Sequence, residues 1–428
     1  MKKEYIMICL EKLGIGGVET AVINQIMAFI QKKYFVVVLS KDGIYRKDIE
    51  KIGAQFIEFD FEITNEFELI KSEKIKKLLV ELNITQVHVH QFSCLNYIIP
   101  VCINMNIPYV LYIHVGILNN SNNVYNWFCE NYPIYNFTFL YSFEFAYKII
   151  AITESAKEYI VNRFNFDEKK CLVIPNCINF NNYISQKKVK TINNILIISR
   201  FSNEKTKLIL NAIDLFFELK KITNNNKLSL TICGDGHEKN KIEQYINDNY
   251  KIAVNFIGET KNVFEVIDKN DCVISTDRCI LEAMATKKIA VISTYDGLKG
   301  VIDKSNIKNV SISNFSANNL PSLNVNEIAK QISFLDESAI NDIIESNYLY
   351  IKNKFNIFDN IYNIDTLDFK NKINYDSLFL KINELPKLDN KCKYLLKEVE
   401  KNNIINYVIF FVILLLYTMK YIEKKKGL

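Results

Sequence analysis

The feature that most constrains this chain is an alternation of short apolar runs with longer amphipathic stretches. The first series of runs has strand length, and comprises Tyr5–Leu10, Tyr34–Leu39, Gln55–Phe59, Gln86–His90, Tyr109–His114 and Lys148–Thr153. A second series comprises Ile195–Ser199, Leu228–Cys233, Ala253–Ile257, Asp271–Ser275 and Ile289–Ser293. Apolar strands that alternate with helices are typical of parallel sheets covered on both faces. The sequence therefore predicts an α/β fold with two successive Rossmann-like, doubly wound domains.

The chain of 428 residues is long enough for two such domains and an extension. A polar stretch without apolar periodicity, from Asn179 to Asn194, predicts the linker between them. The predicted organisation is a first domain over 1–180, a linker over 181–194, a second domain over 195–354, a returning helix over 355–368, an extension over 369–402 and a hydrophobic helix over 403–422.

The hydrophobic helix is predicted from the run IINYVIFFVILLLYTMKY, residues 404–421, which has lysines on both sides. A helix of this length would just cross a hydrocarbon core of about 30 Å. A buried docking helix and a helix lying in the membrane interface are the alternatives. Because the run is apolar on every side, we expect a membrane anchor, with the lysines leaving its direction open.

Net charge and cysteine spacing argue against nucleic-acid binding and against a disulfide or zinc framework. The net charge is +5 and the lysines are dispersed among acidic residues, which disfavours nucleic-acid binding. The ten cysteines form no Cys-x-x-Cys pair and lie largely in apolar runs, as expected of small buried hydrophobes in a reducing compartment. The N-terminal apolar stretch is too short for a signal peptide, so the cytoplasm is the expected location.

A glycine-rich loop, with Gly16 and Gly17, follows the first predicted strand and opens a helix. Such a loop lets backbone N–H groups approach an anionic ligand. Glycine also serves purely steric needs in such turns, so the loop alone is weak support. It lacks the third glycine and the acidic partner of a dinucleotide site, so NAD binding is not favoured.

The second domain offers cations, a turn and a carboxylate at predicted strand ends. Arg200 and Lys205 suit phosphate binding, although two solvated cations are an equal alternative. Gly234 and Asp235 follow another strand and fit an ordinary tight turn as well. Arg278 precedes Glu282 at the start of a helix. A carboxylate beside a nucleotide binds ribose hydroxyls, whereas the same carboxylate can simply stabilise the helix dipole.

Three of the four histidines end predicted strands of the first domain. His88 and His90 point to one face of their strand, and His114 ends the next strand. A structural role is the usual one for a histidine, but three at strand ends favour a functional role for at least one. No carboxylate or cysteine spacing supports a metal site, and we expect no metal.

Taken together, the blocks LGIGGVET, VIPNCINF, SRFSNEK, LTICGDGHEKNKIE, VNFIGETKNV and ILEAMATKKIAVIST resemble family 4 glycosyltransferases of GT-B fold, in the expected order over residues 5–300. The resemblance implies two facing Rossmann-like domains and sugar transfer from a nucleotide-sugar, with retention of anomeric configuration and no metal or other cofactor.

The resemblance also implies roles for particular residues. Gly16 and Gly17 would lie near the donor phosphates, Arg200 and Lys205 would clamp the pyrophosphate, and His114 would lie by the donor sugar. Glu282 would hold the ribose, with Gly234, Asp235 and Arg278 in loops of the donor site. We expect Lys205 and Glu282 on the surface of the cleft, where replacement by alanine would abolish transfer and leave the fold intact.

One departure concerns the paired glutamates of many relatives. The position eight before Glu282 is Ile274, and Asp277 and Arg278 occupy the shortened loop. Ser199 also replaces the glycine that precedes the pyrophosphate arginine. These changes leave the identity of the donor sugar open.

The leading hypothesis is an enzyme that uses a UDP- or GDP-sugar to build a surface polysaccharide or glycolipid at the inner membrane face, on a saccharide or lipid-linked acceptor. The alternative is a degenerate scaffold that binds nucleotide or a partner transferase. A nucleotide-sugar epimerase is disfavoured by the predicted anchor and the Arg200–Lys205 spacing.

Overall fold

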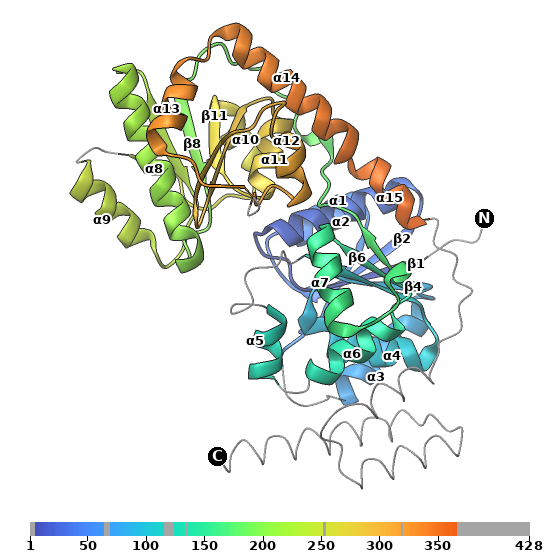
Figure 1. The fold of residues 1–428 in the computed structure, drawn as a ribbon. Helices are drawn as coiled ribbons and strands as arrows, with labels where there is room; N and C mark the ends of the chain where they lie inside the picture. The colour runs from blue at the N-terminus through green and yellow to red at the C-terminus, as the bar shows by residue number, and fades with distance from the viewer. Residues whose placement is uncertain are drawn as a thin grey trace, which may run out of the picture. The chain divides into compact units, whose positions relative to one another are not determined.

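The computed structural model describes residues 5–63, 69–114, 124–132, 135–250, 254–317 and 320–365 (Figure 1). The described chain divides into two compact units. Unit 1 comprises the described residues up to Ile174 together with Ile364 and Asp365, and unit 2 comprises Pro175–Asn363. Each unit is built on its own sheet, as the alternation of apolar runs predicts.

The sheet of unit 1 is parallel throughout its described strands. It contains β1 (Tyr5–Lys12), β2 (Phe35–Lys41), β3 (Gln55–Glu58), β4 (Gln86–Val89), β5 (Tyr109–Ile113), β6 (Lys148–Ala151) and β7 (Cys171–Val173). The spatial order is β3-β2-β1-β4-β5-β6-β7. Strand order therefore reverses between β1 and β4, which makes this pair the topological switch point.

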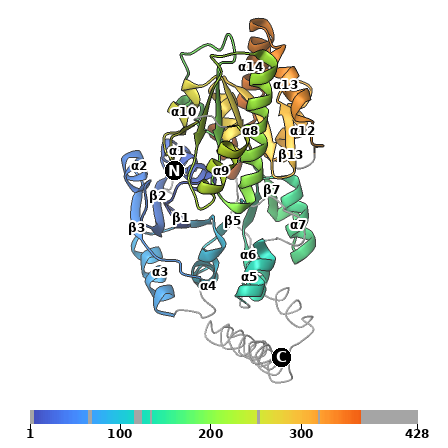
Figure 2. The ribbon, with the colours of Figure 1, turned by 90° about the vertical axis from the view of Figure 1, so that its left-hand side faces the viewer.

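Helices cover both faces of this sheet. The described helices are α1 (Gly17–Gln31), α2 (Arg46–Ile52), α3 (Leu69–Glu81), α4 (Leu95–Met105), α5 (Val124–Asn131), α6 (Tyr135–Phe145) and α7 (Glu154–Phe164), with 3-10 turns η1 (Phe92–Cys94) and η2 (Glu168–Lys170). Helices α3 to α7 pack on one face, and α1 packs on the other (Figure 2). On the face covered by α1, the Phe29 ring meets the His88 ring edge to face.

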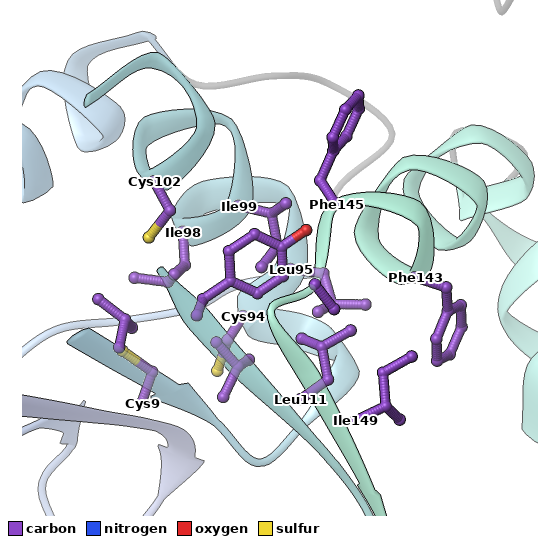
Figure 3. Close-up of a cluster of buried hydrophobic side chains, with 14 of the residues drawn as sticks. Cys9, Cys94, Leu95, Ile98, Ile99, Cys102, Leu111, Phe143, Phe145 and Ile149 are labelled. Carbon is purple, nitrogen blue, oxygen red and sulfur yellow. The ribbon is translucent and has the colours of Figure 1, made fainter. Parts of the chain in front are cut away.

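The core between the sheet and α4 contains three of the cysteines. Cys9 of β1, Cys94 and Cys102 lie among aliphatic side chains such as Ile98 (Figure 3). The described cysteines are free thiols and most are buried, which confirms their predicted use as small hydrophobes. Burial raises the pKa of the Cys102 thiol, so it stays protonated and unreactive.

Unit 2 is also built on a mainly parallel sheet, but one edge of this sheet is an antiparallel strand. Its described strands are β8 (Asn194–Ile198), β9 (Ser229–Cys233), β10 (Asn255–Phe256), β11 (Cys272–Ser275), β12 (Ile289–Thr294) and β13 (Gly297–Val301). The order is β10-β9-β8-β11-β12-β13, parallel except for the antiparallel strand β13. The switch point therefore lies between β8 and β11.

The helices of unit 2 also form two layers. They are α8 (Asn203–Thr223), α9 (Lys239–Asn249), α10 (Val263–Lys269), α11 (Arg278–Ala285), α12 (Ile307–Ile312), α13 (Val325–Ser333), α14 (Glu337–Lys354) and α15 (Ile357–Asp365), with the turn η3 (Phe180–Asn182). Helices α8, α9 and α13 cover one face, and α10, α11 and α12 cover the other (Figure 1).

The predicted linker is tied to unit 2 by polar contacts. Lys187 pairs with Asp271 at 2.9 Å, and Ser185 bonds to Asp268. Lys288, whose side chain is fully buried, donates to the backbone carbonyl of Asp268 at 2.9 Å. The stretch that lacks apolar periodicity is thus held by charges and hydrogen bonds.

The predicted extension over 369–402 and hydrophobic helix over 403–422 lie outside the described residues. Among the residues that are described, no helix is long and apolar enough to span a membrane.

Candidate functional site

Each unit places its motif residues at its own switch point. In unit 1 the glycine loop follows β1, while His90 and His114 follow β4 and β5. In unit 2 Arg200 and Lys205 follow β8, while Arg278 and Glu282 follow β11. Ligands of open α/β sheets bind at the carboxyl ends of strands at such points.

The glycine loop of unit 1 leaves room beside the backbone. A Cβ at Gly14 would meet nothing within 4 Å. Gly16 is the N-cap of α1, with φ −176°, and no side chain caps this helix end. By contrast, Thr153 caps α7 by accepting from the N–H of Ala156 at 3.1 Å. The carboxylate of Glu19, in the first turn of α1, lies against Gly16 at this helix end. The predicted role of Gly16 and Gly17 near an anionic ligand stays a prediction.

The histidines form a layer of stacked rings with Tyr112. The His90 ring lies 4.1 Å from that of Tyr112 at 16°, and 5.3 Å from that of His114 at 26°. His90 Nδ1 and His114 Nε2 are 3.0 Å apart and share a hydrogen bond. Side-chain parity correctly predicts that His88 and His90 share a face, but the two have different partners.

His88 is held within the sheet. Its Nδ1 lies 2.9 Å from the Tyr112 hydroxyl, and its Nε2 lies 3.2 Å from Gln86 Oε1. Burial lowers the pKa of His88 to about 3 and that of His90 well below its usual value. Both rings are therefore neutral at pH 7, and His88 has a structural role. Within the described chain, no cluster of three or more metal-binding side chains is present.

The switch point of unit 2 holds charged side chains in pairs. Lys205 Nζ lies 3.0 Å from Asp277 Oδ2, and both side chains are partly exposed. Asp277 has φ +57° and ψ −132°, a strained conformation for a residue other than glycine, and its N–H donates to the Phe315 carbonyl. Arg200 is exposed on the loop between β8 and α8, and Lys205 lies in the first turn of α8.

The second pair is buried. Arg278 Nε donates to Glu282 Oε1 at 2.8 Å, and the Tyr183 hydroxyl donates to the same oxygen at 3.0 Å. Burial, and then the charge of Glu282, raise the pKa of Tyr183 far above its usual value, so the hydroxyl keeps its proton. The two terminal nitrogens of Arg278 are buried without a hydrogen-bond partner among the described residues.

The position of Glu282 corrects the expectation from the sequence. Only 4% of this residue is exposed, because it faces Arg278 one turn earlier on α11 and lies under Tyr183. The expectation that Glu282 lies on the surface is therefore wrong, and the predicted tolerance of the fold to its replacement loses the exposure on which it rested. Spacing by four residues on a helix was the available signal for the pair. Nothing in the linker sequence indicated Tyr183.

The loop with Gly234 and Asp235 has a packing role. Gly234 has φ +148°, and a Cβ there would overlap the Ser199 carbonyl oxygen. The Asp235 carbonyl accepts from the N–H of Phe201 at 2.9 Å, and its side chain accepts from the N–H of Gly236 at 2.7 Å. These contacts hold the loop after β9 against the loop that carries Arg200. Packing therefore accounts for Gly234 and Asp235, and no ligand is needed to explain them.

The two sites differ in chemistry. Unit 2 offers cations that suit phosphates, together with a carboxylate that suits hydroxyl groups. Unit 1 offers the N-terminus of α1 and neutral imidazoles. The groups of unit 2 can therefore bind an anionic nucleotide and stabilise a leaving phosphate electrostatically, and the imidazoles of unit 1 can form hydrogen bonds with a neutral polar ligand.

Comparisons with known proteins agree with this chemistry. The model of Glycosyltransferase Family 4 matches residues 15–182, and that of Glycosyl transferases group 1 matches residues 192–335. Comparison with curated proteins found no matching sequence.

Several solved structures share the fold. A glycosyltransferase from Rickettsia africae superimposes with a TM-score of 0.64 at 17% identity, covering 87% of this chain and 100% of that one. HepE from Anabaena, in complex with UDP and glucose, gives 0.63 at 16%, covering 84% and 98%. TarM from S. aureus, in complex with fondaparinux, alpha-GlcNAc-glycerol and UDP, gives 0.62 at 13%, covering 87% and 100%.

Two parallel-sheet domains, each with its motif residues at a switch point, and two matching transferase models define a glycosyltransferase of GT-B fold. Together the two models span most of the chain. It belongs to the family 4 and group 1 glycosyltransferases.

Proposed function

We propose that this enzyme transfers a sugar from a nucleotide-sugar, a UDP- or GDP-sugar, to a saccharide or lipid-linked acceptor with retention of anomeric configuration. The observation that carries the donor assignment is the buried Arg278 beside Glu282. Its two terminal nitrogens lack partners within the described part of the chain, and Lys205 lies at the same switch point. A buried guanidinium with unused N–H groups is costly unless a ligand supplies acceptors.

Each charged residue of unit 2 has a proposed task. Arg200 and Lys205 bind the pyrophosphate and offset the charge of the leaving group, so no metal is required. Lys205 exchanges Asp277 for phosphate when the donor binds. Glu282 accepts from the ribose hydroxyls, and Arg278 orients Glu282 through the 2.8 Å bond to Oε1.

The residues of unit 1 complete the proposal. Gly16 and Gly17 leave the N–H groups at the start of α1 available near the donor phosphates. His114 contacts the transferred sugar. UDP is the first nucleotide to test, because the HepE and TarM structures named above contain it.

The proposal is tested by incubating the full chain with UDP- and GDP-sugars and saccharide acceptors. We expect release of one nucleoside diphosphate that depends on acceptor, and a product whose anomeric configuration by NMR equals that of the donor. Nucleotide release with an inverted product would contradict retention. No release with any donor, together with no thermal stabilisation by any nucleoside diphosphate, would contradict the donor assignment.

The site of action is proposed from the sequence. The apolar run over 404–421 and its lysines support a place at the cytoplasmic face of a membrane, where an anchored enzyme would meet a lipid-linked acceptor at high effective concentration. Fractionation of cells that express the full chain or residues 1–402 tests this. Equal membrane association of both forms would contradict the anchor.

A further inference from the structure

Two hydrogen-bond donors converge on one oxygen of the Glu282 carboxylate. The Nε–H of Arg278 donates to Oε1 at 2.8 Å, and the Tyr183 hydroxyl donates to the same atom at 3.0 Å. A carboxylate oxygen has about two lone-pair sites. Both sites of Oε1 are therefore used, so a ligand that approaches Glu282 must bond to Oε2.

The second oxygen, Oε2, remains for such a ligand. No hydrogen bond joins it to another side chain in the described part of the chain, and it is not one of the orphaned buried atoms there, which include both terminal nitrogens of Arg278. Oε2 is therefore accessible from outside, although only 4% of Glu282 is exposed. Its lone pairs can accept from two hydroxyl groups, the number that a vicinal diol offers.

The position of Tyr183 is set by its own segment of the chain. Its N–H donates to the Phe180 carbonyl at 3.1 Å and closes the turn η3. Its ring meets the ring of Phe264 on α10 edge to face, with the centroids 6.2 Å apart. Two residues later, Ser185 bonds to Asp268 of the same helix. Backbone and ring contacts therefore fix the hydroxyl as a donor to the carboxylate.

We infer that Tyr183 is a positioning residue that, together with Arg278, holds Glu282 so that only Oε2 faces a ligand. Glu282 then recognises a pair of adjacent hydroxyl groups through this one oxygen. On the proposed function, on which this last step rests, the pair is the 2′- and 3′-hydroxyls of the donor's ribose. The linker thus contributes to the donor site through Tyr183.

Titration calorimetry of the full chain with UDP and with its 2′-deoxy and 3′-deoxy forms, or with the same forms of GDP, measures this selection. In the wild type, loss of either hydroxyl should weaken binding about 10- to 100-fold, as expected for a hydrogen bond to a charged group. Tyr183→Phe keeps the ring and removes only the O–H. Its ratio of affinities should fall about threefold or more, because the carboxylate can turn and Oε1 regains a lone pair. An unchanged ratio would overturn the positioning role.

Tyr250→Phe is the matched control, because it also removes a phenol from a carboxylate that keeps a second donor. The hydroxyls of Tyr250 and Tyr245 both donate to Asp214 Oδ1, at 2.6 and 2.7 Å, where the end of α9 packs on α8. Tyr250→Phe should leave the ratio of affinities unchanged. An equal fall in both variants would overturn the inference, because it would reflect a general loosening of the fold.

The bond itself can be tested without a nucleotide. Thermal unfolding compares Tyr183→Phe, Glu282→Ala and the double variant. The joint loss of unfolding temperature should be smaller than the sum of the single losses, because both substitutions remove the same bond. Additive losses would overturn the inference whether or not the protein transfers a sugar. If the wild type binds neither UDP nor GDP, the proposed function fails, and this cycle still decides whether Tyr183 holds Glu282.

Discussion

The switch points of the two units use opposite electrostatic means. In unit 1 the polar groups are neutral: His88 and His90 are buried, and their pKa values are lowered chiefly by that burial. In unit 2 the polar groups are charged and paired, as in Lys205–Asp277 and Arg278–Glu282. On the proposed function, the cationic contacts to phosphate therefore come from unit 2, while unit 1 contributes only neutral groups.

The largest expected effect breaks the buried pair of unit 2. Glu282→Ala should lower the free energy of unfolding by about 3–5 kcal/mol, because it leaves the Arg278 charge buried without its partner. Urea denaturation measures this loss. The control is Glu345→Ala, whose exposed pair with Lys287 at 2.7 Å should contribute about 0–1 kcal/mol. Equal losses in the two variants would contradict the buried pair.

The exposed pair of unit 2 should affect catalysis more than stability. Lys205→Ala should lower kcat about 10²- to 10³-fold, as expected when one donor to a developing negative charge is removed. The free energy of unfolding should change by less than about 1 kcal/mol. Steady-state kinetics beside Lys207→Ala, an exposed lysine of the same helix, provides the comparison. A similar kcat for both variants would remove Lys205 from the site.

The glycine loops of the two units should respond differently to a methyl group. Gly234→Ala should destabilise the fold by at least about 1–3 kcal/mol, since φ is +148° and the Ser199 carbonyl occupies the space. Gly14→Ala should change stability by about 0.5 kcal/mol or less, because its surroundings are open. Thermal unfolding compares them. If Gly14→Ala is the more harmful to stability, the packing account of Gly234 is wrong.

The smallest effect concerns the dependence of stability on pH. The pKa of His88 is about 3 in the folded state and about 6.5 unfolded, so the unfolded state binds the extra proton as pH falls below 6.5. Stability should therefore fall with pH, by about 2 kcal/mol from pH 7 to pH 5 for this residue. His88→Gln should lack this contribution. The difference in the free energy of unfolding between the wild type and His88→Gln, measured by denaturation at each pH, should therefore change by about 2 kcal/mol between pH 7 and pH 5. An equal difference at the two pH values would contradict a neutral His88.

Sequence patterns predicted the sheets because apolar strands buried on both faces leave a local signal. The runs Gln86–His90 and Ile195–Ser199 correspond to β4 and β8, which flank the switch points. Strand order leaves no local signal, so the adjacency of β1 to β4 and of β8 to β11 came only from the structure.

Contacts between segments that are distant along the chain could not be predicted from the sequence either. Lys205 and Asp277 were each placed at a strand end, but their pairing depends on the neighbouring positions of β8 and β11. Tyr183 reaches Glu282 from a polar linker that has no periodicity. The burial of Glu282 follows from these contacts, which is why its predicted exposure was wrong.

The division between charged and neutral contacts is tested most directly by titration calorimetry with a nucleoside diphosphate and with the nucleoside alone. Lys205→Ala should weaken binding of the diphosphate and leave that of the nucleoside unchanged, while His90→Leu should leave both unchanged. That result would place the phosphate contacts in unit 2. Equal weakening of both ligands by Lys205→Ala, or loss of diphosphate binding in a folded His90→Leu protein, would contradict the division.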